Sequence, residues 1–329
     1  MTKNRAVLAV DTSNYTTSAA IMDPDGRLLA EQRRLLEVPS GKRGLRQSDA
    51  LFQHVKELPA LLESMTRECE PFTLEAVGFS QRPRNVEGSY MPVFLAGESL
   101  ARSVAALHSI PCYGFSHQEG HVAAGLWSLG LHTSQPFFAL HLSGGTTELL
   151  EVTPDKDGHL DCRILSDTSD ISLGQLIDRV GVAMGLPFPA GPAMEQLAVE
   201  CGRPPFPIAS SITEGRISLS GPETFLMGQV AQNTDPQWLS KSIFHFSGEL
   251  LANMVKKAVP VDQPALLLTV GGVAANGILR LSLAEGLSDL PVTIHHATPV
   301  YCSDNAVGTA YLTIQKRGWW YPDQNPVGF

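Results

Sequence analysis

The sequence is poor in cysteine, in aromatic side chains and in long apolar runs. Its 329 residues include five cysteines and 7% aromatic residues. No two cysteines have the C-x-x-C spacing of a zinc or redox site, and their odd number argues against a disulfide framework, so reduced thiols in the cytosol are the simplest interpretation. The N-terminal apolar run, AVLAV, is too short for a signal peptide or a membrane span. We therefore expect a cytoplasmic protein without membrane attachment.

Basic residues are also scarce, with 24 Lys and Arg against 33 Asp and Glu and a net charge of −9. Affinity for a nucleic-acid backbone comes from Lys and Arg side chains that neutralise phosphates. An RNA partner would therefore need a local basic patch or a second subunit. One segment, GKRGLRQSDALFQH at 41–54, places Lys42, Arg43 and Arg46 before an expected helix capped by Ser48. It is either a solvated loop or a basic edge for tRNA, an anionic acceptor or a partner subunit.

A repeated pattern of short strands and turns is present in two parts of the chain. Residues 7–34 and 137–166 both contain an apolar strand, a Gly, Ser or Thr turn, a second strand, a D-x-D-G turn and a third strand. A shift of 132 positions, the separation of Asp11 and Ser143, also superimposes Asp23 on Asp155. Because two different turns match at one shift, we predict a duplicated fold.

Helical patterns alternate with apolar strands after each repeat, which predicts an α/β protein. The hydrophobic fraction of 43% and the length suit about two domains. We place the lobes at 1–116 and 117–329, with a partly helical insertion near 200–245. The last helix, around 304–316, is expected to return to the first lobe.

Glycine-rich turns follow two of the expected strands of the second lobe. Ser143, Gly144 and Gly145 follow one strand, and Gly271 and Gly272 separate another strand from a helix. Such turns expose backbone N–H groups, which bind phosphates. A plain hairpin turn would also explain the first motif alone. The duplication and the second glycine turn favour nucleotide binding at the carboxyl edge of a sheet.

A histidine pair in HQEGH, residues 117–121, has the spacing of a metal-binding helix. His117 and His121 lie on one helical face and can share an ion. In an H-E-x-x-H protease the general base follows the first histidine, where this chain has Gln118. Glu119 is turned by roughly 200° from His117, which makes peptidase activity a poor prediction and Glu119 a bystander. Asp304, in a polar turn before a helix, is the best third ligand, although an ordinary helix face remains the alternative.

The motifs HQEGHVAAG, LSGG, LIDRVGVAMGLPFPAGPAMEQLA, LTVGGVAANGILR and CSDNA occur in this order. In this, the chain resembles the TsaD-type tRNA N6-threonylcarbamoyladenosine synthases, a family once classed among O-sialoglycoprotein endopeptidases. The resemblance implies the duplicated actin, Hsp70 and sugar-kinase (ASKHA) fold, with two lobes around a nucleotide cleft. It also implies transfer of a threonylcarbamoyl group from its adenylate to N6 of adenosine 37 in tRNA. TsaB-like and TsaE-like subunits are the implied partners.

The resemblance also assigns site residues. One divalent ion, Fe2+ or Zn2+, would be held by His117, His121 and Asp304, with Asp11 as a further catalytic candidate. An adenine nucleotide or adenylate would be bound by residues of the glycine loop and of three later segments: Leu142, Ser143, Gly144, Gly145, Thr146, Asp178, Gly191, Glu195 and Asn276.

Several positions depart from the family pattern. The acidic pair of the family's first turn is Tyr15 and Thr16 here, the histidine after SGG is Thr146, and a family lysine is Glu223. The family's GPG loop reads QRPRN. These changes lie among residues expected near the acceptor. They keep open a carbamoyltransferase with a small-molecule acceptor, and a non-catalytic nucleotide-binding subunit, although retention of the three metal ligands argues against the latter.

Overall fold

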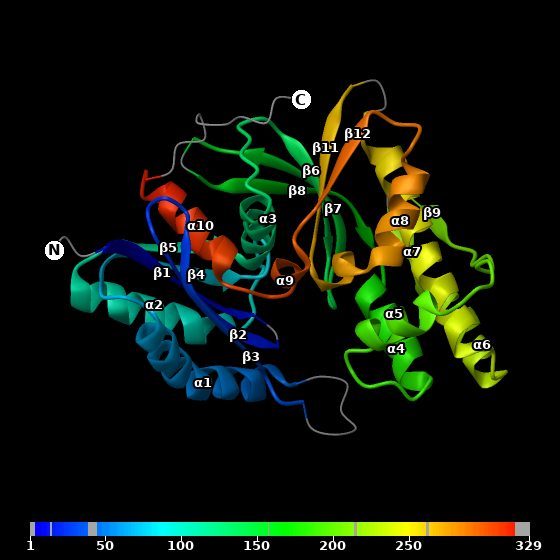
Figure 1. Cartoon of the computed structure of the whole chain (residues 1–329), viewed down its shortest axis with the longest axis horizontal. Coiled ribbons are helices and arrows are strands. Elements are labelled where there is room, and N and C mark those ends of the chain that lie inside the picture. The colour runs from blue at the N-terminus through cyan, green and yellow to red at the C-terminus, as the bar shows by residue number, and fades with distance from the viewer. Residues whose placement is uncertain are drawn as a thin grey trace. The chain divides into compact units, whose positions relative to one another are not determined.

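The computed structural model of the chain describes residues 4–13, 15–38, 45–156, 158–213, 216–260 and 263–319 (Figure 1). By contacts the chain divides into two compact units. Unit 1 is drawn from 1–136, 153–162 and 303–328, and unit 2 from 137–152 and 163–302. This division falls later in the chain than the boundary at 116/117 that the sequence suggested. The last helix belongs to the first unit.

Unit 1 is built on a five-stranded sheet in the order β3-β2-β1-β4-β5. The first three strands are antiparallel neighbours, whereas β4 and β5 run parallel to β1. The elements of this unit are β1 (Asn4–Ser13), β2 (Thr16–Met22), β3 (Leu28–Leu35), α1 (Gln47–Glu68), β4 (Phe72–Arg82), α2 (Phe94–His108), β5 (Cys112–Ser116), α3 (His117–Ser128) and α10 (Val307–Lys316).

The apolar strand β1 is buried along both of its faces. Val10 and its neighbours on one face pack with α1 and α2 in a core that includes Leu61 and Phe79. On the other face α10 contacts β1, β2 and β4. Continuous burial of this kind explains why the strand reads as an unbroken apolar run rather than an alternating one.

Unit 2 is built on a seven-stranded sheet in the order β12-β11-β6-β7-β8-β10-β9. One large core joins this sheet to α4 and α7, with Leu140, Leu176 and Phe244 among its buried side chains. The elements are β6 (Phe137–Leu142), β7 (Thr147–Pro154), β8 (Leu160–Thr168), α4 (Leu173–Ala183), α5 (Gly191–Val199), β9 (Ser211–Thr213), β10 (Arg216–Ser218), α6 (Ser220–Ala231), α7 (Pro236–Ala258), β11 (Ala265–Val270), the 3-10 helix η1 (Gly272–Ala275), α8 (Gly277–Gly286), β12 (Val292–His296) and α9 (Pro299–Cys302).

The predicted repeat is present as two β-meanders, β1-β2-β3 and β6-β7-β8. The expected irregular insertion near 200–245 is the short hairpin β9-β10 followed by α6 and the start of α7. The expected cap of the first helix was wrong: α1 begins at Gln47, and its N-cap residue Arg46 makes no side-chain cap. Lys42 and Arg43 lie outside the described residues. Among the described helices, none has the length and apolarity that crossing a membrane requires.

Candidate metal centre and nucleotide loops

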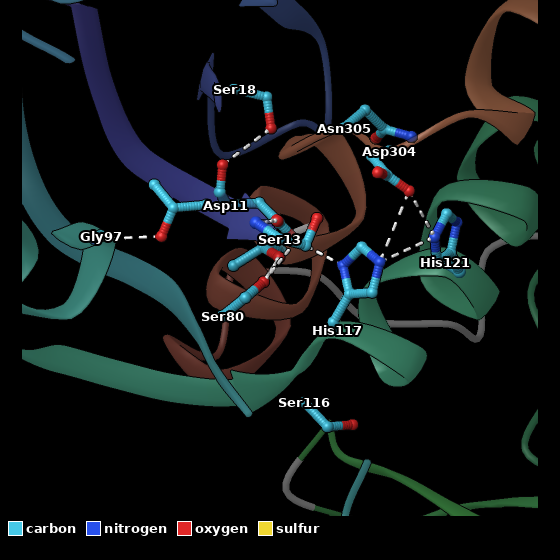
Figure 2. A network of polar contacts seen from close by, with 12 residues as sticks. Asp11, Ser13, Ser18, Ser80, Gly97, Ser116, His117, His121, Asp304 and Asn305 are labelled. Carbon is cyan, nitrogen blue, oxygen red and sulfur yellow. Dashed lines mark hydrogen bonds and ion pairs between the residues drawn. The ribbon is translucent and has the colours of Figure 1, made fainter. Parts of the chain in front are cut away.

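Three chain segments meet at the carboxyl edge of the unit 1 sheet (Figure 2). Asp11 lies near the end of β1, Ser80 near the end of the adjacent strand β4, and His117 directly after β5. Carboxyl ends of parallel strands share one edge of a sheet, which is the usual place for a site in α/β proteins. The strand order therefore gathers these polar side chains, although they are far apart in the sequence.

Helix α3 starts at His117 because its first turn is closed by a capping box. The hydroxyl of Ser116 accepts the Glu119 N–H at 3.1 Å, and the Ser116 N–H donates to the Glu119 carboxylate at 2.8 Å. Glu119 also lies 3.3 Å from the ring of His159. The prediction that Glu119 is a bystander was therefore wrong. Glu119 fixes the first turn of α3, from which His117 and His121 project on one face.

Asp304 reaches the histidines because α10 crosses α3 at very close range. A Cβ on Gly308 would lie 1.8 Å from the carbonyl oxygen of Gly120, so only glycine allows this crossing. Asn305, buried ahead of α10, accepts the Val307 N–H at 3.0 Å and fixes the turn that carries Asp304. The helix pairing therefore delivers the carboxylate to the face of α3 that carries the histidines.

The three side chains converge on one point. Asp304 Oδ1 lies 3.3 Å from His121 Nε2 and 3.6 Å from His117 Nε2, and the two Nε2 atoms are 3.0 Å apart. One ligand atom from each residue lies within 4.8 Å of the others. Two imidazole nitrogens and one carboxylate oxygen suit Zn2+ or Fe2+ and leave coordination positions open. The residues therefore fit a catalytic divalent ion.

Asp11 holds His117 from the side opposite to this convergence point (Figure 2). Its Oδ2 lies 2.8 Å from His117 Nδ1 and accepts the Ser80 hydroxyl at 2.6 Å, while its Oδ1 accepts the Ser13 N–H at 2.8 Å. A carboxylate on Nδ1 leaves Nε2 as the free nitrogen of the ring. This is the outer-shell arrangement that orients histidine ligands of metals.

The electrostatics of this cluster favour a positive charge. Burial opposes the imidazolium, yet Asp11 and Asp304 together raise the pKa of His117 to about 10. Burial likewise opposes ionisation of the two carboxylates, but the pKa of Asp304 is held low by His117 and His121, and that of Asp11 mainly by His117. Two buried carboxylates beside two imidazoles therefore attract a cation, which can be a proton or a metal ion.

In unit 2 the first glycine loop lies against the start of α4. The Ser143 N–H donates to the Thr146 carbonyl at 2.9 Å, and the Ser172 hydroxyl donates to the Gly144 carbonyl at 2.8 Å. A Cβ on Gly174 would lie 2.5 Å from the Ser143 carbonyl oxygen. Gly144 and Gly145 are exposed, so the loop presents its backbone outward.

The second glycine turn packs beside the first. β11 and β6 are parallel neighbours, and Gly271, with φ of 95°, approaches Leu142 so closely that a Cβ would lie 2.3 Å from its carbonyl oxygen. Such a φ favours glycine. Asn276 accepts the Leu279 N–H at 2.8 Å and so caps α8. Both glycine turns therefore lie at the carboxyl edge of the unit 2 sheet.

Two carboxylates connect the remaining positions of this region. Asp178 accepts the Ala190 N–H at 2.7 Å, directly before Gly191, and burial raises the pKa of Asp178. Glu195 accepts the Gly277 N–H at 2.7 Å, next to Asn276. Contacts within unit 2 thus hold the Asp178 side chain beside Gly191 and the Glu195 side chain beside Asn276. Their role in binding stays a prediction.

Two departures from the family pattern have a structural context. Glu223, at the position of a family lysine, accepts two hydrogen bonds from Arg179 at 3.0 and 3.1 Å, so its charge is compensated. Thr16 is buried in β2, while Tyr15 is half-buried in the preceding turn.

Sequence reasoning missed Ser80, because a serine in an apolar strand gives no signal of its bond to Asp11.

Comparison with known proteins bears on fold and family. The family model of TsaD, tRNA N6-adenosine threonylcarbamoyltransferase, matches residues 39–311. HypF of T. kodakarensis is 12% identical, with a TM-score of 0.61 over 98% of this chain and 49% of its own. Component A of (R)-2-hydroxyglutaryl-CoA dehydratase from Acidaminococcus fermentans is 14% identical, with a TM-score of 0.58 over 95% and 99%. A ROK family glucokinase from Streptomyces griseus, in complex with glucose and AMPPNP, is 15% identical, with a TM-score of 0.53 over 94% and 99%. At these identities the structures show the fold, which is the duplicated ASKHA fold.

Proposed function

This chain belongs to the TsaD family of tRNA N6-adenosine threonylcarbamoyltransferases, and from that premise we propose a metal-dependent reaction. The chain transfers a threonylcarbamoyl group from threonylcarbamoyl-adenylate to N6 of adenosine 37 in tRNA. The observation that carries the proposal is the convergence of His117, His121 and Asp304 within 4.8 Å. A purely structural helix pair has no need of three such donors with their ligand atoms facing one point.

The residues of unit 1 prepare this site for Fe2+ or Zn2+. Asp11 keeps the proton of His117 on Nδ1, so that Nε2 is directed to the ion. The capping box of α3 and the close crossing with α10 fix the positions of the donors. A divalent ion bound there supplies Lewis acidity to the carbamoyl carbonyl of the substrate. Asp11 thus acts as a positioning residue.

The loops of unit 2 bind the adenylate. The exposed backbone of Gly144 and Gly145 suits a phosphate, and Asp178 suits a ribose diol. The chemistry is an acyl substitution: the bond from the carbamoyl carbon to N6 forms, the bond from that carbon to the phosphate oxygen breaks, and the proton of N6 passes to the departing phosphate. The substrate already carries a good leaving group, adenosine monophosphate, so no nucleophilic side chain is required.

The acidic character of the chain makes partners part of the proposal. A net charge of −9 provides little attraction for tRNA phosphates. We therefore expect TsaB-like and TsaE-like subunits to assist tRNA binding, in the cytoplasm.

Mass spectrometry of nucleosides tests the reaction. The full chain, loaded with Zn2+ or Fe2+, is incubated with threonylcarbamoyl-adenylate, tRNA and candidate partner subunits, and the tRNA is then digested. Threonylcarbamoyladenosine is expected with the wild type and with His108→Ala, whose side chain is exposed on α2, but not with His121→Ala. Absence of modified adenosine from every wild-type reaction, with the ion bound and the adenylate intact, would contradict the proposal.

A second acceptor class is favoured by one observation, the Arg179–Glu223 ion pair. At the position where the family has a lysine, this chain has Glu223 on α6, whose charge is neutralised by Arg179 on α4. Loss of a positive charge near an acceptor suits a small-molecule amine better than an RNA. In the same assay, consumption of the adenylate with a small amine, but never with tRNA, would select this alternative. If the chain shows no metal binding and no turnover with any acceptor, a non-catalytic subunit is indicated instead.

A further inference from the structure

Two polar residues extend beyond the metal cluster at the ends of adjacent strands. β1 and β4 are parallel neighbours, and the bond from Ser80 to Asp11 links them near their carboxyl ends. Ser13 and Arg82 each lie two residues further along these strands and end them. The two residues therefore belong to the same edge of the sheet as the metal cluster.

Ser13 has a buried hydroxyl with no use inside the protein. Its side chain is 1% exposed, and its backbone N–H donates to Asp11. Among the described residues its Oγ has no hydrogen-bond partner. Burying a hydroxyl without a hydrogen bond is unfavourable, so such a group is usually kept for a ligand or an ordered water. In Figure 2 Ser13 lies beside Asp11, on the side of the cluster that faces His117.

Arg82 is an arginine without a carboxylate partner in the part of the chain that the structure describes. Most other described arginines pair with acids, as Arg34 does with Glu57. The Nη2 of Arg82 donates to the neutral amide oxygen of Asn85 at 2.6 Å, and its Nε is enclosed with no partner. A guanidinium carries five donors, so most of its capacity is open to an anion.

The backbone of Arg82 lies directly beside the start of the metal-bearing helix. Its Cα is the register partner of Ser116, the residue before His117. The next residue, Pro83, accepts the Gln118 N–H at 3.0 Å. Arg82 therefore lies beside the residue that precedes His117, at the sheet edge where the three donors gather. This position is part of the QRPRN loop, which departs from the family's GPG.

We infer that Ser13 and Arg82 form a carboxylate subsite beside the metal centre, which takes the carboxylate of a carbamoylated amino acid. The inference rests on the proposed function for the identity of that group. In a threonylcarbamoyl group only one nitrogen and the α-carbon separate the carbamoyl carbon from the carboxyl carbon. A carbonyl held at the metal therefore brings its carboxylate close to the residues that flank the metal. A guanidinium fork and a hydroxyl match a carboxylate in geometry and charge.

Calorimetric titration of the zinc-loaded full chain tests the subsite. The probes are N-carbamoyl-L-threonine and its neutral methylamide, which differ in the carboxylate alone. The variants are Arg82→Gln and Ser13→Ala, with Arg34→Gln as the control for loss of one positive charge elsewhere in unit 1. Bound zinc and thermal unfolding are measured for each variant, so that loss of the ion or of the fold is seen separately.

Arg82→Gln is expected to weaken binding of the acid by about 10- to 100-fold, the effect of a charge-assisted hydrogen bond, and to leave the methylamide within about 2-fold. Ser13→Ala weakens the acid by a smaller factor, and Arg34→Gln by less than about 2-fold. Equal losses for both probes, or no loss with Arg82→Gln while zinc remains bound, would overturn the inference.

The inference and the proposed function fail in different ways. If wild-type chain never modifies tRNA but Arg82→Gln still selectively loses the acid, the subsite stands and the acceptor assignment falls. If the wild type modifies tRNA and Arg82→Gln has the same KM for the adenylate and the same affinity for the acid, only the subsite falls.

Discussion

The two meanders of this chain have the same topology and offer different chemistry at the same place. In unit 1 the end of β1 presents side chains, and Asp11 and Ser13 there are each 1% exposed. In unit 2 the turn after β6 presents backbone, and Gly144 and Gly145 are exposed. A fold of this kind fixes where a site forms. The residue types then decide whether that site offers buried oxygen ligands or open N–H groups.

The two units also resemble each other in that one glycine contact positions each candidate site. In unit 1 a glycine on α10 lets two helices cross and delivers Asp304 to the histidines. In unit 2 Gly174 lets a loop rest on the first turn of α4. Each site thus depends on one contact that a methyl group would prevent, and substitutions can separate the two.

The largest expected effect is loss of a metal ligand in unit 1. His121→Ala removes one of three donors, so zinc content should fall from about one ion per chain to near zero, and transferase activity by about 1000-fold or more. His108→Ala, on the exposed face of α2, should retain both. Elemental analysis after gel filtration, with the nucleoside assay, measures the effect. Full zinc content in His121→Ala would show that the cluster is not the metal site.

Steric change at the helix crossing is next. Gly308→Ala forces a Cβ to within 1.8 Å of the Gly120 carbonyl oxygen, and should lower the free energy of unfolding by about 3 kcal/mol or more and weaken zinc binding. Gly228→Ala in α6 meets nothing within 4 Å and should stabilise by up to about 1 kcal/mol. Urea unfolding compares them. Gly174→Ala in unit 2 should leave zinc affinity unchanged and weaken binding of an adenine nucleotide. Weaker zinc binding by Gly174→Ala would contradict the independence of the two sites.

Both units contain a histidine bonded to a strand threonine, and both histidines should make the stability of the protein depend on pH. The rings of His54 and His296 lie 2.8 Å from the hydroxyls of Thr17 and Thr269, and burial lowers each pKa to about 4. An unfolded histidine titrates near 6.5, so the unfolded state binds the extra proton first. The stability is therefore complete above about pH 6.5 and is lost as the pH falls toward 4.

For His54, which is completely buried, the loss is on the order of 3 kcal/mol. Unfolding by urea between pH 7.5 and 4.5 measures it. His54→Gln, which keeps a polar partner for Thr17, should have a shallower pH dependence than the wild type. His108→Gln serves as the exposed control. If His54→Gln and the wild type lose stability in parallel, the buried ring is not the cause.

The smallest effect is expected from Asp11, which contacts His117 on the side away from the three donors. Asp11→Asn keeps the shape of the side chain but removes the charge that orients His117, so zinc affinity should fall by about 10- to 100-fold. Competition with a chelating dye gives the affinity. Asn276→Ala, which removes the cap of α8 in unit 2, should leave zinc affinity unchanged. Unaltered zinc binding in Asp11→Asn would mean that His117 is positioned without Asp11.

Much of the fold followed from local patterns. The repeat at a shift of 132 positions, from Asp11 to Ser143, predicted the duplication, and the helical pattern around 304–316 predicted the last helix, Val307–Lys316. The H-x-x-x-H spacing predicted the histidine pair. The boundary at 116/117 followed the order of elements, whereas contacts assign α3 to unit 1 because it packs on α10. Packing between distant segments has no local signature.

The sequence by itself identified the candidate site residues, which are the two histidines on one helical face and the glycine turns, and it predicted the duplication of the strands. Only the tertiary structure decided their surroundings. Asp11 meets Ser80 and His117, which are 69 and 106 positions away. Arg82 pairs with the amide oxygen of Asn85, and with no carboxylate among the described residues. Side-chain spacing along a helix or strand is set by backbone geometry and can be read from the chain. Which strands become neighbours, and how closely two helices approach, depends on the packing of the whole unit.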